Sequence, residues 1–326
     1  MKIAFITDGG SEKGMGHVQQ STTLAEELRD RGEICFLTKS DETVVKQIRN
    51  LGFNTFKLNN DDEMLDLLHE IRPNIVIIDK LDVAESLAKN LKETLRAKLV
   101  IFTNLTLANR YADIAVSAVI GSNFKNSKFL DQKTNTLYFY GPKYWVLRKE
   151  FYELKKKGKR LTDKVEKILL IFGGSDYSNL TSIALSELLR LDNDYKIDVI
   201  VGAHFEHFDA LNQVFAQYPN KKESLNLYRN INNVAELMYS ADLVIASPGL
   251  SVFEALCVGT PVVVGHQNQF QKDGFKGFVP TLGKEDMNRL GDVLTSAAFV
   301  DPRQENITRL EIGEGKTELI ETIIGG

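Results

Sequence analysis

The sequence contains few cysteines and no long apolar run. Cys35 and Cys257 are its two cysteines, and both lie in apolar stretches, which predicts buried free thiols in a reducing compartment. No stretch of about eighteen apolar residues occurs, so no membrane-spanning helix is expected. An apolar strand pattern begins at residue 2, with no signal peptide pattern ahead of it. We therefore expect a soluble, cytoplasmic protein.

The sequence also lacks an excess of positive charge and the common cofactor motifs. Its 40 Lys and Arg residues against 44 Asp and Glu give a net charge of −4, which argues against a nucleic-acid partner. Neither G-x-G-x-x-G nor G-x-x-x-x-G-K-[ST] is present, which weighs against nicotinamide dinucleotides and ATP P-loops. The acidic cluster at 60–63 fits a helix N-terminus better than a metal site. We expect neither a metal nor a cofactor.

A regular alternation of strand and helix patterns fills the chain instead. At 326 residues it is long enough for two domains. The alternation pauses at a basic stretch, 155–160, and restarts at 168–172. Such alternation predicts right-handed βαβ units around a parallel sheet. We expect an α/β protein with two doubly wound domains, 1–148 and 149–326, whose loop ends face a central cleft that holds the ligand.

The segment 243–256 (LVIASPGLSVFEAL) predicts a buried strand, a tight turn and a helix start. Open α/β sheets bind ligands at such junctions. Ser247 is expected to cap the helix, Pro248 to fill its first position, and Gly249 to let a ligand approach the backbone. Backbone amides at this helix start would attract phosphate.

Two alternatives stay open for Glu254, which lies one turn into that helix beside Ser251. Its carboxylate could accept hydrogen bonds from the hydroxyls of a ribose. Alternatively, Ser251 and Glu254 form a capping box that serves only the helix. A second glycine turn, Gly173-Gly174-Ser175, follows the strand pattern 168–172 and offers further amides to a diphosphate without a metal.

Four stretches, taken in order, give the chain a family resemblance. They are GMGH at 14–17 after Asp8, GPKY at 141–144 with LR at 147–148 and EF at 150–151, FGGSD at 172–176 with NLT at 179–181, and 241–269. With them the chain resembles GT-B fold enzymes, the class of two Rossmann-like domains that includes many nucleotide-sugar glycosyltransferases. Within that class it is similar to the UDP-sugar hydrolase of pseudaminic acid biosynthesis and to related spore coat polysaccharide proteins.

The resemblance implies a sugar or acceptor site in the first domain and UDP binding in the second. The residues expected to bind the substrate are Asp8, Gly14, Gly16, Asp79, Arg148, Asn268 and Gln269. The residues expected to bind UDP are Gly173, Gly174, Ser175, Ser247, Gly249, Ser251 and Glu254. For Asn268 and Gln269 the residues themselves leave open a purely local role in a polar turn. The four histidines at 69, 204, 207 and 266 lack partners at ligand spacing and are expected on the surface or in loops.

His17 matches the histidine that acts as general base in the family, where it activates water against the anomeric carbon. Its place at a helix N-terminus predicts a lowered pKa, because the positive end of the helix dipole disfavours the imidazolium. A neutral imidazole near pH 7 suits a general base. The alternative is a histidine that only lies at the start of a helix.

Three positions on the sugar side depart from the family pattern. Gln20 stands where an arginine is usual, Lys80-Leu81 where an aromatic residue follows the aspartate, and Thr103-Asn104 where acidic residues are expected. These departures concern the sugar more than the nucleotide. They leave the identity of the sugar open.

The function predicted from these observations is a metal-independent UDP-sugar hydrolase. It would release UDP from an amino or deoxy sugar nucleotide in surface polysaccharide or glycan biosynthesis, with water activated by His17. The alternative is a GT-B glycosyltransferase that moves the sugar from UDP to an alcohol acceptor. A lesser alternative is a non-catalytic nucleotide-sugar-binding protein. The sequence predicts neither the sugar nor the oligomeric state.

Overall fold

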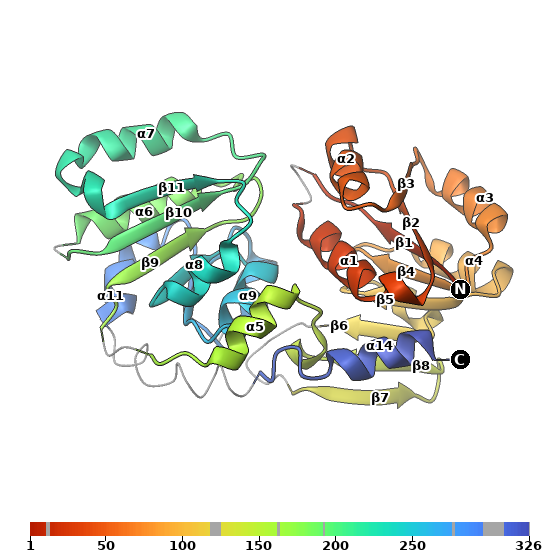
Figure 1. The fold of residues 1–326 in the computed structure, drawn as a ribbon. Coiled ribbons are helices and arrows are strands. Elements are labelled where there is room, and N and C mark those ends of the chain that lie inside the picture. Colours follow the sequence, from red (N-terminus) through yellow and green to blue (C-terminus); the bar gives the residue numbers. More distant parts are fainter. Residues whose placement is uncertain are drawn as a thin grey trace. The chain divides into compact units, whose positions relative to one another are not determined.

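The computed structural model describes residues 1–10, 14–117, 125–161, 164–191, 193–275, 278–295 and 310–325, without the side chain of Phe270. It divides into two compact units (Figure 1). Unit 1 comprises Met1–Val119, Phe124–Leu147 and Ile312–Gly326, and unit 2 is built around Arg148–Glu311. Each unit contains its own sheet.

Unit 1 contains an eight-stranded sheet in the order β3-β2-β1-β4-β5-β6-β8-β7. Its strands are β1 (Lys2–Thr7), β2 (Glu33–Thr38), β3 (Asn54–Lys57), β4 (Ile75–Asp79), β5 (Lys98–Phe102), β6 (Ile114–Ser117), β7 (Ser127–Asp131) and β8 (Thr136–Tyr140). Its helices are α1 (Gly16–Glu27), α2 (Glu42–Asn50), α3 (Asp61–Ile71), α4 (Glu85–Thr94) and α14 (Lys316–Ile324), with 3-10 turns at Arg29–Arg31, Leu107–Tyr111 and Pro142–Tyr144. Only β7 runs antiparallel to its neighbour among these paired strands.

Alternating side chains along the central strands explain why both faces of this sheet are covered. Ile3 and Phe5 of β1 pack on the side of α1, α2 and α14, whereas Ala4 and Ile6 pack on the side of α3 and α4. A parallel strand that is buried on both faces reads as a continuous apolar run, as β1 does. The strand pair β7 and β8, at the edge of the sheet, was not predicted.

Unit 2 contains a six-stranded parallel sheet in the order β11-β10-β9-β12-β13-β14. Its strands are β9 (Lys167–Ile171), β10 (Lys196–Val201), β11 (Leu225–Arg229), β12 (Leu243–Ala246), β13 (Val262–Gly265) and β14 (Thr281–Leu282). Its helices are α5 (Lys149–Lys157), α6 (Leu180–Arg190), α7 (Phe208–Gln217), α8 (Val234–Ser240), α9 (Leu250–Cys257), α10 (Gln269–Phe275) and α11 (Leu290–Thr295), with 3-10 turns at Pro219–Ser224 and Met287–Arg289.

The C-terminal helix α14 lies in unit 1, although the sequence places it in the second domain, 149–326. Leu319, Ile320 and Ile323 of α14 are buried in the core cluster that contains Phe5. Lys316 also forms an ion pair with Glu27, with 2.7 Å between Nζ and Oε1. Sequence order cannot predict this return, because an amphipathic helix specifies an apolar face and not the sheet that it covers.

Both sheets reverse their strand order at one point. In unit 1 the reversal lies between β1 and β4, and in unit 2 between β9 and β12. Loops that leave the carboxyl ends of neighbouring strands diverge at such a point, and open α/β sheets bind ligands there. The loop after β1 leads to His17, and the loop after β12 leads to Glu254.

Candidate functional site

In unit 1, His17 and Asp79 form a hydrogen-bonded pair at the carboxyl edge of the sheet. His17 is the second residue of α1, and Asp79 is the last residue of β4, opposite Thr7 of β1. Nδ1 of His17 lies 2.7 Å from Oδ1 of Asp79. The strand reversal thus brings together two residues that are 62 positions apart in the sequence.

Asp79 is held from two further sides. Its side chain is 2% exposed. Oδ1 accepts a hydrogen bond from Oγ1 of Thr103 at 2.6 Å, and Oδ2 accepts one from Oγ of Ser21 at 3.4 Å. Thr103 adopts φ +56°, which a β-branched residue rarely adopts and which marks a strained position. These contacts fix the carboxylate that orients the imidazole.

The geometry leaves one ring nitrogen of His17 available. Because a carboxylate oxygen can only accept, Nδ1 of His17 donates a hydrogen bond to Asp79, and among the described residues no group hydrogen-bonds to Nε2. The side chain is 18% exposed, so it is accessible from one side. The neutral tautomer that this arrangement selects carries its lone pair on Nε2, as a general base requires.

The expected lowering of the His17 pKa is wrong. Burial does lower the pKa, but the charge of Asp79 and the hydrogen bond to it raise it, with smaller upward effects from Asp82 and Asp8. The net result is a pKa above the ordinary value of 6.5. An opposite charge in direct contact outweighs the partial charge of a helix end.

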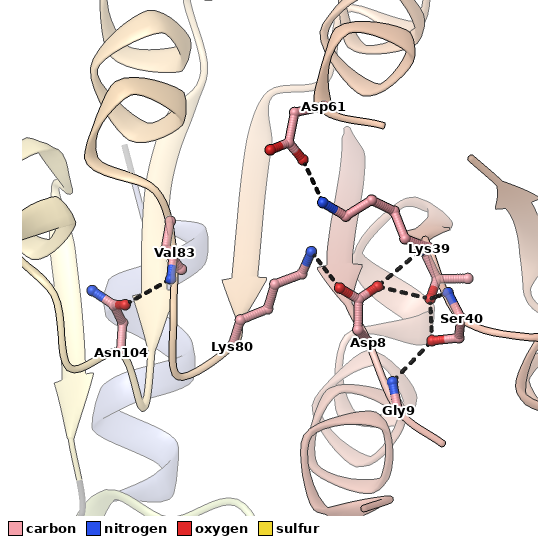
Figure 2. A network of polar contacts seen from close by, with 9 residues as sticks. Asp8, Gly9, Lys39, Ser40, Asp61, Lys80, Val83 and Asn104 are labelled. Atoms are coloured by element: carbon pink, nitrogen blue, oxygen red, sulfur yellow. Dashed lines mark hydrogen bonds and ion pairs between the residues drawn. The ribbon is translucent and has the colours of Figure 1, made fainter. Parts of the chain in front are cut away.

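Asp8, whose charge also acts on His17, lies in a network of short polar contacts that Figure 2 shows. Its Oδ1 accepts hydrogen bonds from the backbone amide of Lys39 at 2.8 Å and from Oγ1 of Thr38 at 3.2 Å. Its Oδ2 lies 2.8 Å from Nζ of Lys80. The carboxylate is therefore engaged on both oxygens, and its observed partners are protein groups.

The glycine loop after Asp8 brings the chain to α1. The amide of Gly10 donates to the carbonyl of Gly14 at 3.1 Å, and Gly14 adopts φ +72°, where glycine is favoured. Gly16 begins α1 directly before His17. The predicted role of Gly14 and Gly16 in substrate binding stays a prediction, but both glycines lie in the short segment that positions the imidazole.

In unit 2, two loops meet at the strand reversal. A Cβ added to Gly173 would lie 3.4 Å from Oγ of Ser247, so the turn after β9 and the turn after β12 are neighbours. Gly173 and Gly249 have φ +81° and +143°. Within the described residues, the amides of Gly249 and Ser251 have no hydrogen-bond acceptor. These amides are available to an anion.

The start of α9 differs from its prediction in detail. The helix begins at Leu250 with Gly249 as its N-cap and without a side-chain cap, so neither Ser247 nor Pro248 occupies the predicted position. The capping-box interpretation of Ser251 and Glu254 is also wrong. Glu254 bonds to a different partner.

That partner is Arg148, the residue that directly precedes α5. Nη2 of Arg148 lies 3.2 Å from Oε1 of Glu254, and Nη1 lies 3.1 Å from Glu150. Glu254 is 4% exposed. Burial raises its pKa, while the charge of Arg148 and the hydrogen bond from it oppose that rise. Arg148 thus holds an acidic group one turn inside the start of α9, where the amides of Gly249 and Ser251 lie.

The amides at the start of α6 are not available in the same way. Asp176 accepts hydrogen bonds from the backbone amides of Leu180 at 2.9 Å and Thr181 at 2.8 Å. This carboxylate caps the helix, so an anion at the loop after β9 would meet Gly173, Gly174 and Ser175 rather than the helix end. The FGGSD stretch contains Asp176, but its spacing to the helix does not identify Asp176 as the cap.

The polar residues after β13 make local contacts. Oδ1 of Asn268 accepts from the amide of Gln271 at 2.9 Å, and Nε2 of Gln269 donates to Asp273 at the same distance. Both contacts are local, as a role in a polar turn predicts. The role of Asn268 and Gln269 in substrate binding stays a prediction. His266, expected on the surface or in a loop, follows β13 but is 6% exposed, and burial lowers its pKa.

Comparisons with known proteins give a family match in the second half of the chain and structural matches over 99% of it. Residues 168–271 match the family described as the glycosyltransferase family 28 C-terminal domain. The structure of MurG from Acinetobacter baumannii superposes with a TM-score of 0.65 at 14% identity, covering 99% of each chain. HepE from Anabaena, solved with UDP-glucose, superposes with a TM-score of 0.56 at 14% identity, covering 99% of this chain and 97% of that one. The chain has the GT-B fold.

Sequence relatives of this GT-B chain include both kinds of protein that the motifs resemble. It is 26% identical to the spore coat polysaccharide biosynthesis protein SpsG of Bacillus subtilis, over 92% of this chain and 87% of that one. It is 23% identical to the UDP-2,4-diacetamido-2,4,6-trideoxy-beta-L-altropyranose hydrolase of Campylobacter jejuni, over 78% and 88%. The predicted resemblance is confirmed.

A further relative is an uncharacterized protein of Methanocaldococcus jannaschii, 44% identical over 99% of this chain. The GT-B chain spans 66% of that relative's length. Within the described ranges, no helix combines the length and the apolar character needed to cross a membrane.

Proposed function

We propose that this GT-B protein hydrolyses a UDP-sugar, with His17 as the general base and unit 2 as the holder of UDP. Water attacks the anomeric carbon, its proton passes to Nε2 of His17, and the bond between that carbon and the β-phosphate oxygen breaks. UDP leaves with the electron pair of that bond. The products are the free sugar and UDP.

The His17–Asp79 pair is the observation that carries this proposal. The hydrogen bond from Nδ1 to Asp79 fixes the orientation of the imidazole and leaves Nε2 to accept a proton from water. Asp79 also stabilises the imidazolium that forms when the proton arrives. The raised pKa means that activity depends on deprotonation of His17 and increases with pH through that pKa.

The glycine turns of unit 2 support the proposed role in UDP binding. The unpartnered amides of Gly249 and Ser251 would meet the diphosphate and stabilise the charge that grows on the leaving group. Glu254, one turn further, would accept hydrogen bonds from the ribose hydroxyls. Arg148 would counteract the rise in the Glu254 pKa that burial causes.

The relatives support the class of reaction. The name of the Campylobacter jejuni relative describes a UDP-sugar hydrolase, and the Bacillus subtilis relative is named for polysaccharide biosynthesis. We extend both to this chain as a proposal: the substrate is an amino or deoxy sugar nucleotide of glycan biosynthesis. No step in the scheme requires a metal.

A second candidate is transfer of the sugar to an alcohol, with His17 deprotonating a hydroxyl instead of water. The match of residues 168–271 to a glycosyltransferase family favours this candidate. A non-catalytic nucleotide-sugar binder is the third possibility.

One experiment separates the three. The protein is incubated with a panel of UDP-sugars, with and without a crude acceptor fraction, and free UDP is followed by chromatography. Hydrolysis predicts UDP release without acceptor, lost in His17→Ala. Release only with acceptor supports transfer, and binding without release supports the non-catalytic protein. Near-native turnover in His17→Ala would remove His17 from the mechanism.

A further inference from the structure

Lys80 is a buried lysine beside the His17–Asp79 pair. It follows Asp79 directly, its side chain is 9% exposed, and its Nζ lies 2.8 Å from Oδ2 of Asp8 (Figure 2). A lysine is rarely this buried without a charged partner, because desolvation of the ammonium is costly. The ion pair therefore connects the end of β4 to the end of β1.

Asp8 directly precedes the glycine loop, so its contacts also hold the start of that loop. Its other oxygen is bound by Lys39 and Thr38 at the end of β2. The next residue, Gly9, donates its amide to Oγ of Ser40 at 2.8 Å. The first residues of the loop are thus fixed on both sides, toward β2 and toward β4.

The loop in turn packs against α1. A Cβ added to Gly9 would lie 2.7 Å from Cγ2 of Val18, the residue after His17. A shift of Asp8 or Gly9 would therefore displace the first turn of α1, and with it the imidazole. Small displacements matter here, since a misplacement of about 1 Å in a catalytic group can lower a rate by roughly 100-fold.

The charge of Lys80 lies in contact with one of the acids that act on the same histidine. The groups that act on His17 are Asp79, Asp82 and Asp8, and all three are acidic. Among the ion pairs of the described residues, Asp8 is the one of these three acids that a lysine ammonium contacts. Without that ammonium, the Asp8 carboxylate would favour the imidazolium more strongly, and less of the free base would be present at neutral pH.

We propose that Lys80 is a positioning residue for His17: its ammonium ties the end of β4 to the glycine loop and compensates the Asp8 carboxylate beside the base. The proposal rests on the proposed role of His17 in UDP-sugar hydrolysis. It gives Lys80, a departure from the family pattern, a role in the reaction that needs no contact with the substrate.

Opposite pH shifts test the proposal. In Lys80→Met the acid limb of the kcat profile for UDP release moves to higher pH, and kcat falls roughly 10- to 100-fold at its optimum. In Asp8→Asn the acid limb moves to lower pH. The double variant, which removes both charges, returns the limb toward its original position. Lys80→Arg, which keeps the charge, leaves the limb in place.

A purely structural ion pair gives a different pattern. All variants would then lose activity and thermal stability, with the acid limb unmoved, and this outcome would overturn the proposal. If Lys80→Met does not fold, Lys80→Gln, which removes the charge and keeps a polar end group, gives the same test: its acid limb should also move to higher pH, and an unmoved limb would overturn the proposal. Lys316→Met is the matched control, because its ammonium pairs with Glu27 at 2.7 Å, at the opposite end of α1 from His17. Its acid limb should stay unchanged.

A measurement without substrate separates this proposal from the proposed function. The titration of His17 is followed by NMR in protein labelled at histidine carbons, with the signal assigned by its loss in His17→Gln. Lys80→Met should raise the midpoint and Asp8→Asn should lower it. If His17 proves dispensable for UDP release, the proposed function fails, while the NMR shifts still decide whether Lys80 acts on His17. Unchanged midpoints would refute the proposal.

Discussion

Replacing Asp79 by asparagine tests the proposed base most sharply, because it keeps the shape and removes the charge. The carboxylate accepts three hydrogen bonds, from His17, Thr103 and Ser21. An asparagine can turn its amide nitrogen toward Nδ1 of His17 and so hold the tautomer whose Nε2 carries a proton. That tautomer cannot accept a proton from water at Nε2.

The magnitude follows from what the carboxylate supplies. A positioned general base contributes roughly 10²- to 10⁴-fold, and an aspartate-to-asparagine change behind a catalytic histidine costs about 10⁴-fold in kcat. We expect a loss of about 10³-fold or more in Asp79→Asn, equivalent to about 4 kcal/mol of transition-state stabilisation. The fold should survive, because the asparagine amide oxygen still accepts from Ser21 and its nitrogen can donate to Thr103, so the contacts of this buried group are weakened and not lost.

The assay is release of UDP from a UDP-sugar, followed from pH 5 to 9. In Asp79→Asn, burial still lowers the His17 pKa while the charge that raised it is gone, so the remaining activity should have its acid limb at lower pH. The matched control is Asp113→Asn, because Asp113 precedes β6 at the opposite edge and binds the amide of Leu99 at 2.8 Å. Asp79→Asn with kcat within about fivefold of the parent would refute the argument, given the 10²- to 10⁴-fold expected of a general base.

Three further predictions follow from other parts of the chain. Because the pKa of His17 is raised in the folded protein, His17 stabilises the fold fully below its unfolded pKa and loses this effect as pH rises through the folded pKa. In urea unfolding, His17→Gln should therefore lower the free energy of unfolding more at pH 6 than at pH 9. Glu254→Gln should weaken UDP binding roughly 10- to 100-fold by calorimetry with little change in melting temperature, and the reverse would assign Glu254 to the fold alone. A Cβ on Gly202 would lie 2.5 Å from Cα of Gly174. Gly202→Ala should therefore cost about 1–3 kcal/mol of unfolding free energy and weaken UDP binding. Gly274→Ala should do neither, because a Cβ at this position of α10 meets open space. Equal stabilities for these two glycine variants would contradict the packing argument.

The sequence predicts the alternation of strands and helices well, because parallel strands buried on both faces are continuous apolar runs. β1, β4, β9 and β12 all follow this rule. The strands β7 and β8 do not follow this rule. Phe129 of β7 is 47% exposed and stacks on Tyr138 of β8, so this edge strand lacks the apolar pattern of a buried one.

The candidate site could be predicted at the level of loops and not of contacts. A glycine loop ahead of His17 and an aspartate at the end of a strand are visible in the sequence. Their hydrogen bond depends on which strands are neighbours, and strand order is a property of the whole sheet. Thr103 joins the site through a backbone conformation that its residue type disfavours, and no local signal predicts that.

The errors in unit 2 have a similar cause. Ser251 and Glu254 have the spacing of a capping box, but the buried Glu254 lies near Arg148, 106 residues away in the sequence. A charged long-range partner outweighs a local amide for a buried carboxylate. Local motifs are therefore least reliable where a buried charge is involved, and these are also the positions proposed to bind the substrate.

The measurement that tests the central claim most directly is the fate of oxygen from labelled water. A UDP-sugar that the protein consumes is incubated with it in H₂¹⁸O, and both products are analysed by mass spectrometry immediately after the reaction. Attack of a water activated by His17 on the anomeric carbon predicts one ¹⁸O in the released sugar and none in UDP. Label in the β-phosphate of UDP, or an unlabelled sugar attached to an acceptor, would contradict the account.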